Sequence, residues 1–120
     1  MHIHQDQDFR DETNLIRLLE HLDYAIEDVR TMRSARALEN NRVLLNSVAM
    51  EMTQVQECAR RLSDAFHDAR PDLPWKELRA LRNVLVHEYD EIDVVALYGT
   101  VTVDAPRLAA SLRPIVDAIV

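Results

Sequence analysis

The stretch RNVLVHEY, from Arg82 to Tyr89, sets polar side chains that could bind an anion or move a proton into an apolar run. The planar guanidinium of Arg82 matches phosphate oxygens and keeps its charge at neutral pH. The imidazole of His87 can take up and return a proton near neutrality. Asn83 can orient that imidazole or hold a ribose hydroxyl. Arginine with histidine is the smallest set for metal-free RNA cleavage, because the 2′-OH of RNA is itself a nucleophile once deprotonated.

The spacing of these residues relates them on the expected helix. Each residue turns about 100° around a helix axis, so Arg79 lies about 60° and His87 about 140° from Arg82 in one direction. Tyr89 falls about 20° to the other side. Asn83 and His87, four residues apart, are direct neighbours. Arg82 then stands beside the apolar face, where a guanidinium needs a carboxylate, an interface or an anionic ligand.

A purely structural interpretation of the same stretch stays open. Arg82 could pair with Glu57, with Glu88 or with an acid on another helix. His87 could be a hydrogen-bonded histidine of the core. For each residue taken alone, the structural interpretation is favoured. The functional interpretation depends on four polar residue types occurring together at one helix end.

The chain that must position these residues is predicted to be one all-α domain. Its 120 residues, 48% of them hydrophobic, suffice for a single core. Its one glycine, Gly99, argues against hairpins and phosphate-binding loops. We expect a flexible N-terminus over 1–12 and a helical domain over 13–120, an up-and-down bundle of four to five helices.

Apolar residues at helical spacing predict the individual helices. The first should begin near Asp11 or Thr13, either of which can cap it, and end near Arg33. A second helix, or two joined, should run to Ala69, and a third should start at Pro74 and carry the RNVLVHEY stretch. The apolar face of the first helix is Leu15, Leu18, Leu19, Leu22, Ile26 and Val29. The seam of the second is Leu45, Val48, Met52, Val55, Ala59, Leu62 and Phe66.

A fourth helical segment should begin near Val94, after a turn and cap over 90–93. Residues 99–103 are mostly β-branched, but a lone strand has no partner, so we predict helix there. Pro106 and Pro114 should kink or restart this helix.

The charge is acidic overall and basic in one place. A net charge of -7 argues against general, charge-driven binding to nucleic acid. Residues 29–42 are the exception, since they carry one acid, Glu39, and a basic cluster of Arg30, Arg33, Arg36 and Arg42. A phosphate-binding track and a solvated helix face both fit this cluster. The single cysteine, Cys58, should be a buried apolar residue.

No metal or cofactor is expected. A di-metal carboxylate bundle needs two acid-x-x-histidine pairs, and the chain offers one, Asp64 with His67. His67 and His21 fit helix surfaces, and His2 and His4 belong to the expected flexible tail. No apolar run approaches the about 20 residues that span a bilayer. The N-terminus lacks the features of a signal peptide, so we expect a cytoplasmic protein with no membrane partner.

The motif Arg82-x4-His87-x-Tyr89, with Asn83 after the arginine, resembles that of the HepT-like toxins of the HEPN superfamily. The flanking residues fit as well, with Leu73-Pro74-Trp75-Lys76-Glu77-Leu78 before the motif and Asp90-Glu91-Ile92-Asp93 after it. The resemblance extends more loosely over residues 15–115.

This resemblance implies a helical bundle that forms a homodimer and acts as a metal-independent endoribonuclease, the toxin of a toxin–antitoxin pair. The implied partner is a minimal nucleotidyltransferase antitoxin, which attaches AMP to the motif tyrosine, here Tyr89, and can form a higher hetero-oligomer. Arg82 and His87 would be catalytic and Asn83 supporting. The candidate RNA-binding residues are Arg79, Lys76, Arg33 and Arg36.

A non-catalytic function is the alternative. The bundle would then only dimerise and dock a nucleotidyltransferase or another protein, with Arg82 in an interface ion pair. The acidic balance of the chain favours this alternative.

Overall fold

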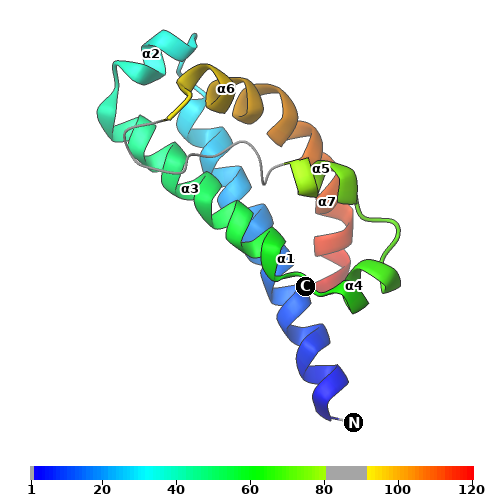
Figure 1. Cartoon of the computed structure of the whole chain (residues 1–120). Helices are drawn as coiled ribbons and strands as arrows, with labels where there is room; N and C mark the ends of the chain where they lie inside the picture. Colours follow the sequence, from blue (N-terminus) through cyan, green and yellow to red (C-terminus); the bar gives the residue numbers. More distant parts are fainter. Residues whose placement is uncertain (1, 81–91) are drawn as a thin grey trace.

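Long helices packed lengthwise form the body of the molecule (Figure 1). The computed structural model describes residues 2–80 and 92–120, with side chains from Asp6 onward. α1 (His2–Val29) packs against α3 (Arg42–Arg61), which runs antiparallel to it, and against α7 (Ala105–Ile119). The remaining elements are α2 (Ala35–Glu39), α4 (Asp64–Ala69), α5 (Trp75–Ala80), α6 (Val94–Gly99) and the π-helical η3 (Thr100–Asp104).

The all-α prediction is confirmed, since residues 2–80 and 92–120 contain helices and no strand. No helix of that described part is both long and apolar enough to cross a membrane. A dimer and a flexible segment over 1–12 stay predictions.

The start of α1 differs from the prediction, and this changes the role of Asp11. The helix begins at His2, so a start near Asp11 or Thr13 is wrong. Asp11 is instead fully buried, and its two carboxylate oxygens accept hydrogen bonds from Ser63, Oδ1 from the backbone N at 2.9 Å and Oδ2 from Oγ at 2.7 Å. Ser63 is the N-cap of α4. One buried carboxylate therefore holds the point where the chain leaves α3 and enters α4.

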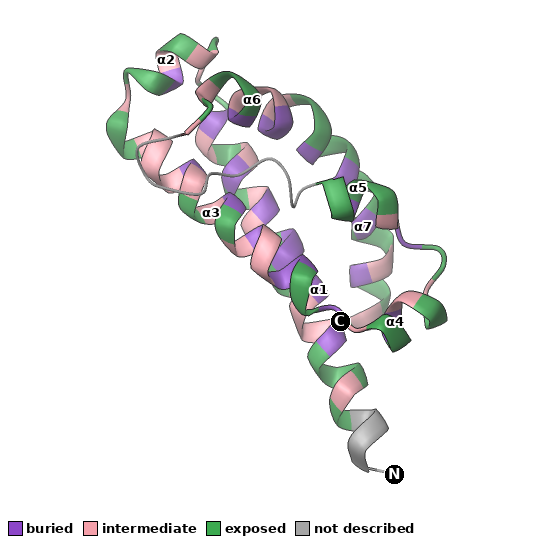
Figure 2. Ribbon diagram, in the orientation of Figure 1, coloured by how far each residue is buried: buried purple, intermediate pink, exposed green. Residues whose placement is uncertain are grey.

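The apolar faces predicted for the first two helices form the core, as predicted. Figure 2 shows buried positions gathered where the helices face one another. All predicted members of both faces are buried except Ile26 and Leu45, which are partly buried against the core. Cys58 is buried as expected, and its burial raises the pKa of the thiol above the ordinary value. The residue is therefore a protonated, apolar part of the core at neutral pH.

The segment predicted as a second helix, or two joined, is divided into three. α1 already ends at Val29 rather than Arg33, and Ser34 then caps α2 by accepting a hydrogen bond from N of Ala37. Asn41 caps α3 and Ser63 caps α4. A polar side chain that satisfies the free N–H groups opens each helix, so the breaks follow the capping residues rather than the apolar pattern.

The β-branched run over 99–103 is helical, as predicted. It lies in a continuous rod from α6 through η3 into α7. The wider π turn of η3 directly precedes Pro106, which has no N–H to donate and whose ring crowds the turn before it. The helix therefore adjusts its turn rather than restarting, and it also continues through Pro114.

We expect Asp11→Ala to lower the free energy of unfolding by about 1–3 kcal/mol, because it leaves the donors of Ser63 without their acceptor. Urea denaturation followed by circular dichroism measures the effect. Asp8→Ala is the matched control, since Asp8 is exposed on the same helix, and it should change stability by less than about 0.5 kcal/mol. Equal effects of the two substitutions would contradict the role assigned to Asp11.

Candidate functional site

The four residues of the opening motif, Arg82, Asn83, His87 and Tyr89, lie outside the described residues. Their convergence on one site therefore stays a prediction. The structure does place the elements on either side of them. α5 is described up to Ala80, and the chain is described again from 92, where the predicted cap precedes α6.

Glu57, one of the acids considered as a partner for Arg82, has partners of its own. Its carboxylate forms ion pairs with Arg60 and with Arg61, both one turn further along α3. This carboxylate is therefore already engaged on the surface of its own helix.

Trp75 fixes the start of α5 against α4. Its indole Nε1 donates a hydrogen bond of 2.7 Å to the carbonyl oxygen of Arg70. Its ring meets the Phe66 ring edge-on at 6.2 Å and the His67 ring at 4.6 Å between centroids. Leu78 on the same helix is buried in the core. These contacts hold α5 against α4 and the core.

The loop between α4 and α5 is closed by a paired arginine and carboxylate. Arg70 donates from Nε to Oδ1 of Asp72 at 3.1 Å and from its terminal nitrogen to Oδ2 at 2.9 Å. These hydrogen bonds hold the pKa of Asp72 below its ordinary value. Because the carbonyl of Arg70 also accepts from Trp75, the loop and the start of α5 are connected through one residue.

Two of the four candidate RNA-binding residues, Lys76 and Arg79, lie exposed on α5. Arg79 donates a hydrogen bond of 3.0 Å from its guanidinium to Nε2 of His67. His67 was predicted to be a plain helix-surface residue; it is half-buried and sits between Trp75 and Arg79. No sequence spacing signals this contact, because the chain turns twice between α4 and α5.

The other two candidate RNA-binding residues, Arg33 and Arg36, lie in a different part of the molecule from α5. Both are exposed, one in the connection after α1 and one in α2. α2 packs against α6 at the opposite end of the bundle from α4, well away from α5 (Figure 1). The structure therefore divides the candidate RNA-binding residues into two separate pairs.

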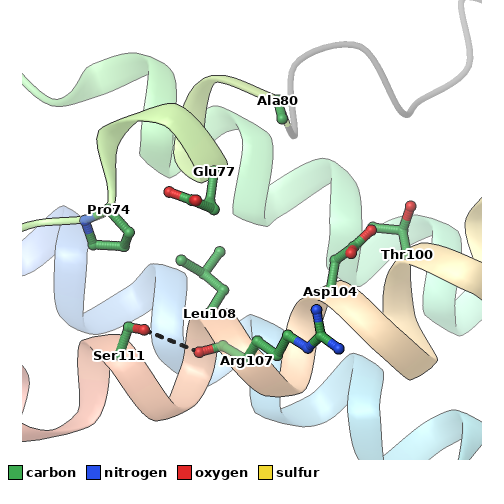
Figure 3. Close-up of a pocket in the computed structure, with 8 residues that line it drawn as sticks. All are labelled: Pro74, Glu77, Ala80, Thr100, Asp104, Arg107, Leu108 and Ser111. Atoms are coloured by element: carbon green, nitrogen blue, oxygen red, sulfur yellow. Dashed lines mark hydrogen bonds between the residues drawn. The ribbon is translucent and has the colours of Figure 1, made fainter.

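A cavity of about 450 Å³ opens between α5 and the η3–α7 rod (Figure 3). Glu77 reaches into it from α5, while Asp104 and Arg107 approach from the opposite wall. Ala80, the last described residue of α5, completes the rim. Sequence reasoning did not find this cavity, since its two walls are brought together only by the fold.

Comparison with known proteins indicates the same family that the motif resembles. The model of the family described as "Ribonuclease HepT-like" matches residues 18–115. A candidate RNase of Methanocaldococcus jannaschii is 33% identical over 69 residues, which are 58% of this chain and 63% of that protein. A second candidate RNase of the same organism is 23% identical over 105 residues, 88% of this chain and 86% of that protein.

A candidate ribonuclease HepT of Thermococcus cleftensis is 33% identical over 54 residues, 45% of this chain and 49% of that protein. The chain thus spans just under two thirds of the first of these relatives and about half of the third. No solved structure matches the chain.

We expect Arg70→Gln to raise the pKa of Asp72 toward its ordinary value, because the substitution removes the donors that stabilise the carboxylate. The pair stabilises the fold above the ordinary pKa of Asp72, and this contribution is lost as the pH falls through the lowered value. Carboxyl NMR titration measures the change, with Arg60→Gln on α3 as control. A midpoint for Asp72 that is the same in all three proteins would refute the assignment.

Proposed function

The chain belongs to the HepT-like ribonuclease family, and on this basis we propose that it is a metal-independent endoribonuclease, the toxin of a toxin–antitoxin pair. The observation that carries the proposal is the family match over 18–115, which includes the whole motif from Arg82 to Tyr89. The relatives named as candidate RNases support the same reaction.

The proposed reaction uses the RNA's own 2′-OH as nucleophile. His87 removes the 2′-OH proton, and the oxygen then forms a bond to the adjacent phosphorus while the bond to the 5′-oxygen breaks. The proton returns to the departing 5′-oxygen, which leaves as a hydroxyl, and the phosphorus is left in a 2′,3′-cyclic phosphate. Arg82 stabilises the negative charge that develops on the phosphorane. Asn83 orients the imidazole or the ribose. Each kind of assistance contributes roughly a hundredfold or more to the rate.

The substrate must be held on a protein that carries a net charge of -7. We assign this role to the exposed pair Lys76 and Arg79 on α5, which enters the motif segment. Arg33 and Arg36, at the far end of the bundle, are proposed to contact a more distant part of the RNA. Local basic pairs of this kind bind the phosphate backbone in a salt-dependent manner.

Regulation by a partner completes the proposal. A minimal nucleotidyltransferase antitoxin would attach AMP to Tyr89, and the bulky anionic nucleotide would occupy the groove that RNA phosphates need near Arg82. The toxin would act as a cytoplasmic homodimer, within a larger hetero-oligomer when the antitoxin is bound.

A non-catalytic docking module is the second candidate, favoured by the acidic net charge. Arg82 would then serve an interface ion pair instead of a scissile phosphate. The two functions differ in one respect that can be measured directly, the cleavage of RNA by the purified chain.

We expect the purified chain to cut single-stranded RNA in excess EDTA, and His87→Ala to slow cleavage by about a hundredfold or more, because the general base is lost. Gel analysis of a defined RNA measures the rate. His21→Gln is the control, since His21 pairs with Glu51 on the α1–α3 surface, and it should cut at the wild-type rate. Intact cleavage by His87→Ala would remove this residue from the mechanism, and an inert wild type would favour the docking module.

Incubation with the antitoxin and ATP should add AMP to Tyr89 and stop cleavage. Peptide mapping by mass spectrometry locates the added mass. Tyr89→Phe should stay unmodified and insensitive to the antitoxin, whereas Tyr98→Phe, which removes the hydroxyl that donates to the Met32 carbonyl, should still be modified. Modification that persists in Tyr89→Phe refutes the assignment.

A further inference from the structure

The junction of α4 and α5 contains a pair of nitrogen groups that face each other without an acid between them. The guanidinium of Arg79 lies 3.0 Å from Nε2 of His67, at the edge of a cavity of about 150 Å³. Arginine donates hydrogen bonds and never accepts them, so Nε2 must be the acceptor. In this contact Nε2 therefore carries no proton, and Nδ1 faces Oδ1 of Asp68 at 3.5 Å.

The contact with His67 leaves other N–H donors of the Arg79 guanidinium unused. A guanidinium carries five N–H groups, and within the described ranges Arg79 contacts His67 and forms no ion pair with a carboxylate. Its side chain is exposed. The positive charge is thus available to an anion from solvent, and the planar fork suits phosphate oxygens.

The pair is held in place before any ligand arrives. The His67 ring lies on Trp75, 4.6 Å between centroids, and the Trp75 indole is itself fixed by its hydrogen bond to the Arg70 carbonyl. Arg79 stands four residues after Trp75, on the same side of α5. A site whose donors are already oriented loses less conformational entropy when it binds.

We propose that His67 and Arg79 bind a backbone phosphate of RNA, and that His67 takes up a proton when the phosphate binds. This proposal rests on the proposed function for the identity of the ligand. Nε2 carries no proton while it accepts from Arg79 in this contact. A phosphate between them reverses this, because it accepts from the guanidinium and from the new Nε2–H at once.

The charges around His67 are few. From α4, Asp68 contacts Nδ1 and stabilises the imidazolium, while Asp64 lines the cavity and opposes the anion. From α5, Arg79 is the charged group that contacts the ring and lines the cavity, and Lys76 and Glu77 of that helix are not among the lining residues. Ala59, which lines the cavity from α3, is uncharged. Arg79 thus faces the two acids Asp64 and Asp68, and protonation of His67 brings the local positive and negative charges into balance.

A 2′-O-methyl RNA oligonucleotide tests the pair, because it presents phosphates but has no free 2′-OH to attack. Its affinity for the full chain is measured at pH 6 and pH 8, at one salt concentration, by fluorescence anisotropy of labelled RNA and by emission of Trp75, the single tryptophan. The wild type should bind at least about threefold more tightly at pH 6, because one proton is taken up on binding. His67→Gln should lose this pH difference.

Arg79→Gln should weaken binding at both pH values and lower the salt slope by about one. His21→Gln and Arg60→Gln, on the α1–α3 part of the surface, are matched controls and should bind like the wild type. Thermal melts of all variants exclude unfolding as the cause. A His67→Gln variant with the full wild-type pH difference overturns the proposal, and so does an Arg79→Gln variant with unchanged affinity and salt slope.

Competition by inorganic phosphate is the second part of the test. Phosphate should compete with the oligonucleotide in the wild type and compete at least about threefold less well in Arg79→Gln. If phosphate changes Trp75 emission but both variants bind RNA normally, the pair is a free-anion site and the RNA assignment is wrong. The oligonucleotide could bind with the expected pH dependence although the chain cuts no RNA. The proposed ribonuclease function would then be wrong, and the phosphate-binding role of His67 and Arg79 would be retained.

Discussion

The buried carboxylate of Asp11 is the contact on which the placement of α4 and α5 depends. It accepts two hydrogen bonds from Ser63, the residue at which the chain turns from the long α3 into the short α4. α4 in turn presents Phe66 and His67 to Trp75, and Trp75 begins α5, which precedes the motif in the sequence. A buried acceptor with two donors tolerates little displacement, because each lost bond leaves an unsatisfied polar group. The placement of α4 and of the start of α5 therefore depends on a residue near the N-terminus of the chain.

The apolar pattern predicted the core well, since helical periodicity reports burial directly. Leu15, Leu18 and Leu22 on α1 and Val48, Met52 and Val55 on α3 are all buried as expected. The same pattern failed for Asp11. A short polar residue before an apolar run has the appearance of a helix cap, and its real partner lies 52 residues further along the chain. A contact over that separation leaves no periodic signal in the sequence.

The same limit applies to the site. His67 is predicted to lie on a helix surface, and its contacts with Trp75 and Arg79 arise only after the chain turns between α4 and α5. The sequence predicts the RNA-binding residues by their charge alone. The fold separates Arg33 and Arg36 from Lys76 and Arg79 on α5. The roles of the motif residues stay predictions from residue type and spacing, whereas the contacts of His67 with Trp75 and Arg79 required the tertiary structure.

In the proposed function an acidic protein places two separate pairs of exposed cations, Lys76 with Arg79 and Arg33 with Arg36, on its surface and leaves the nucleophile to the RNA substrate. The central claim is that the 2′-OH next to the scissile phosphate attacks that phosphate. The most direct test maps one cut site in a defined RNA and then replaces the nucleotide on its 5′ side with the 2′-deoxy form. Cleavage should disappear at that position and continue at the others. Cleavage that persists at the deoxy position would show that water is the nucleophile and would contradict the account.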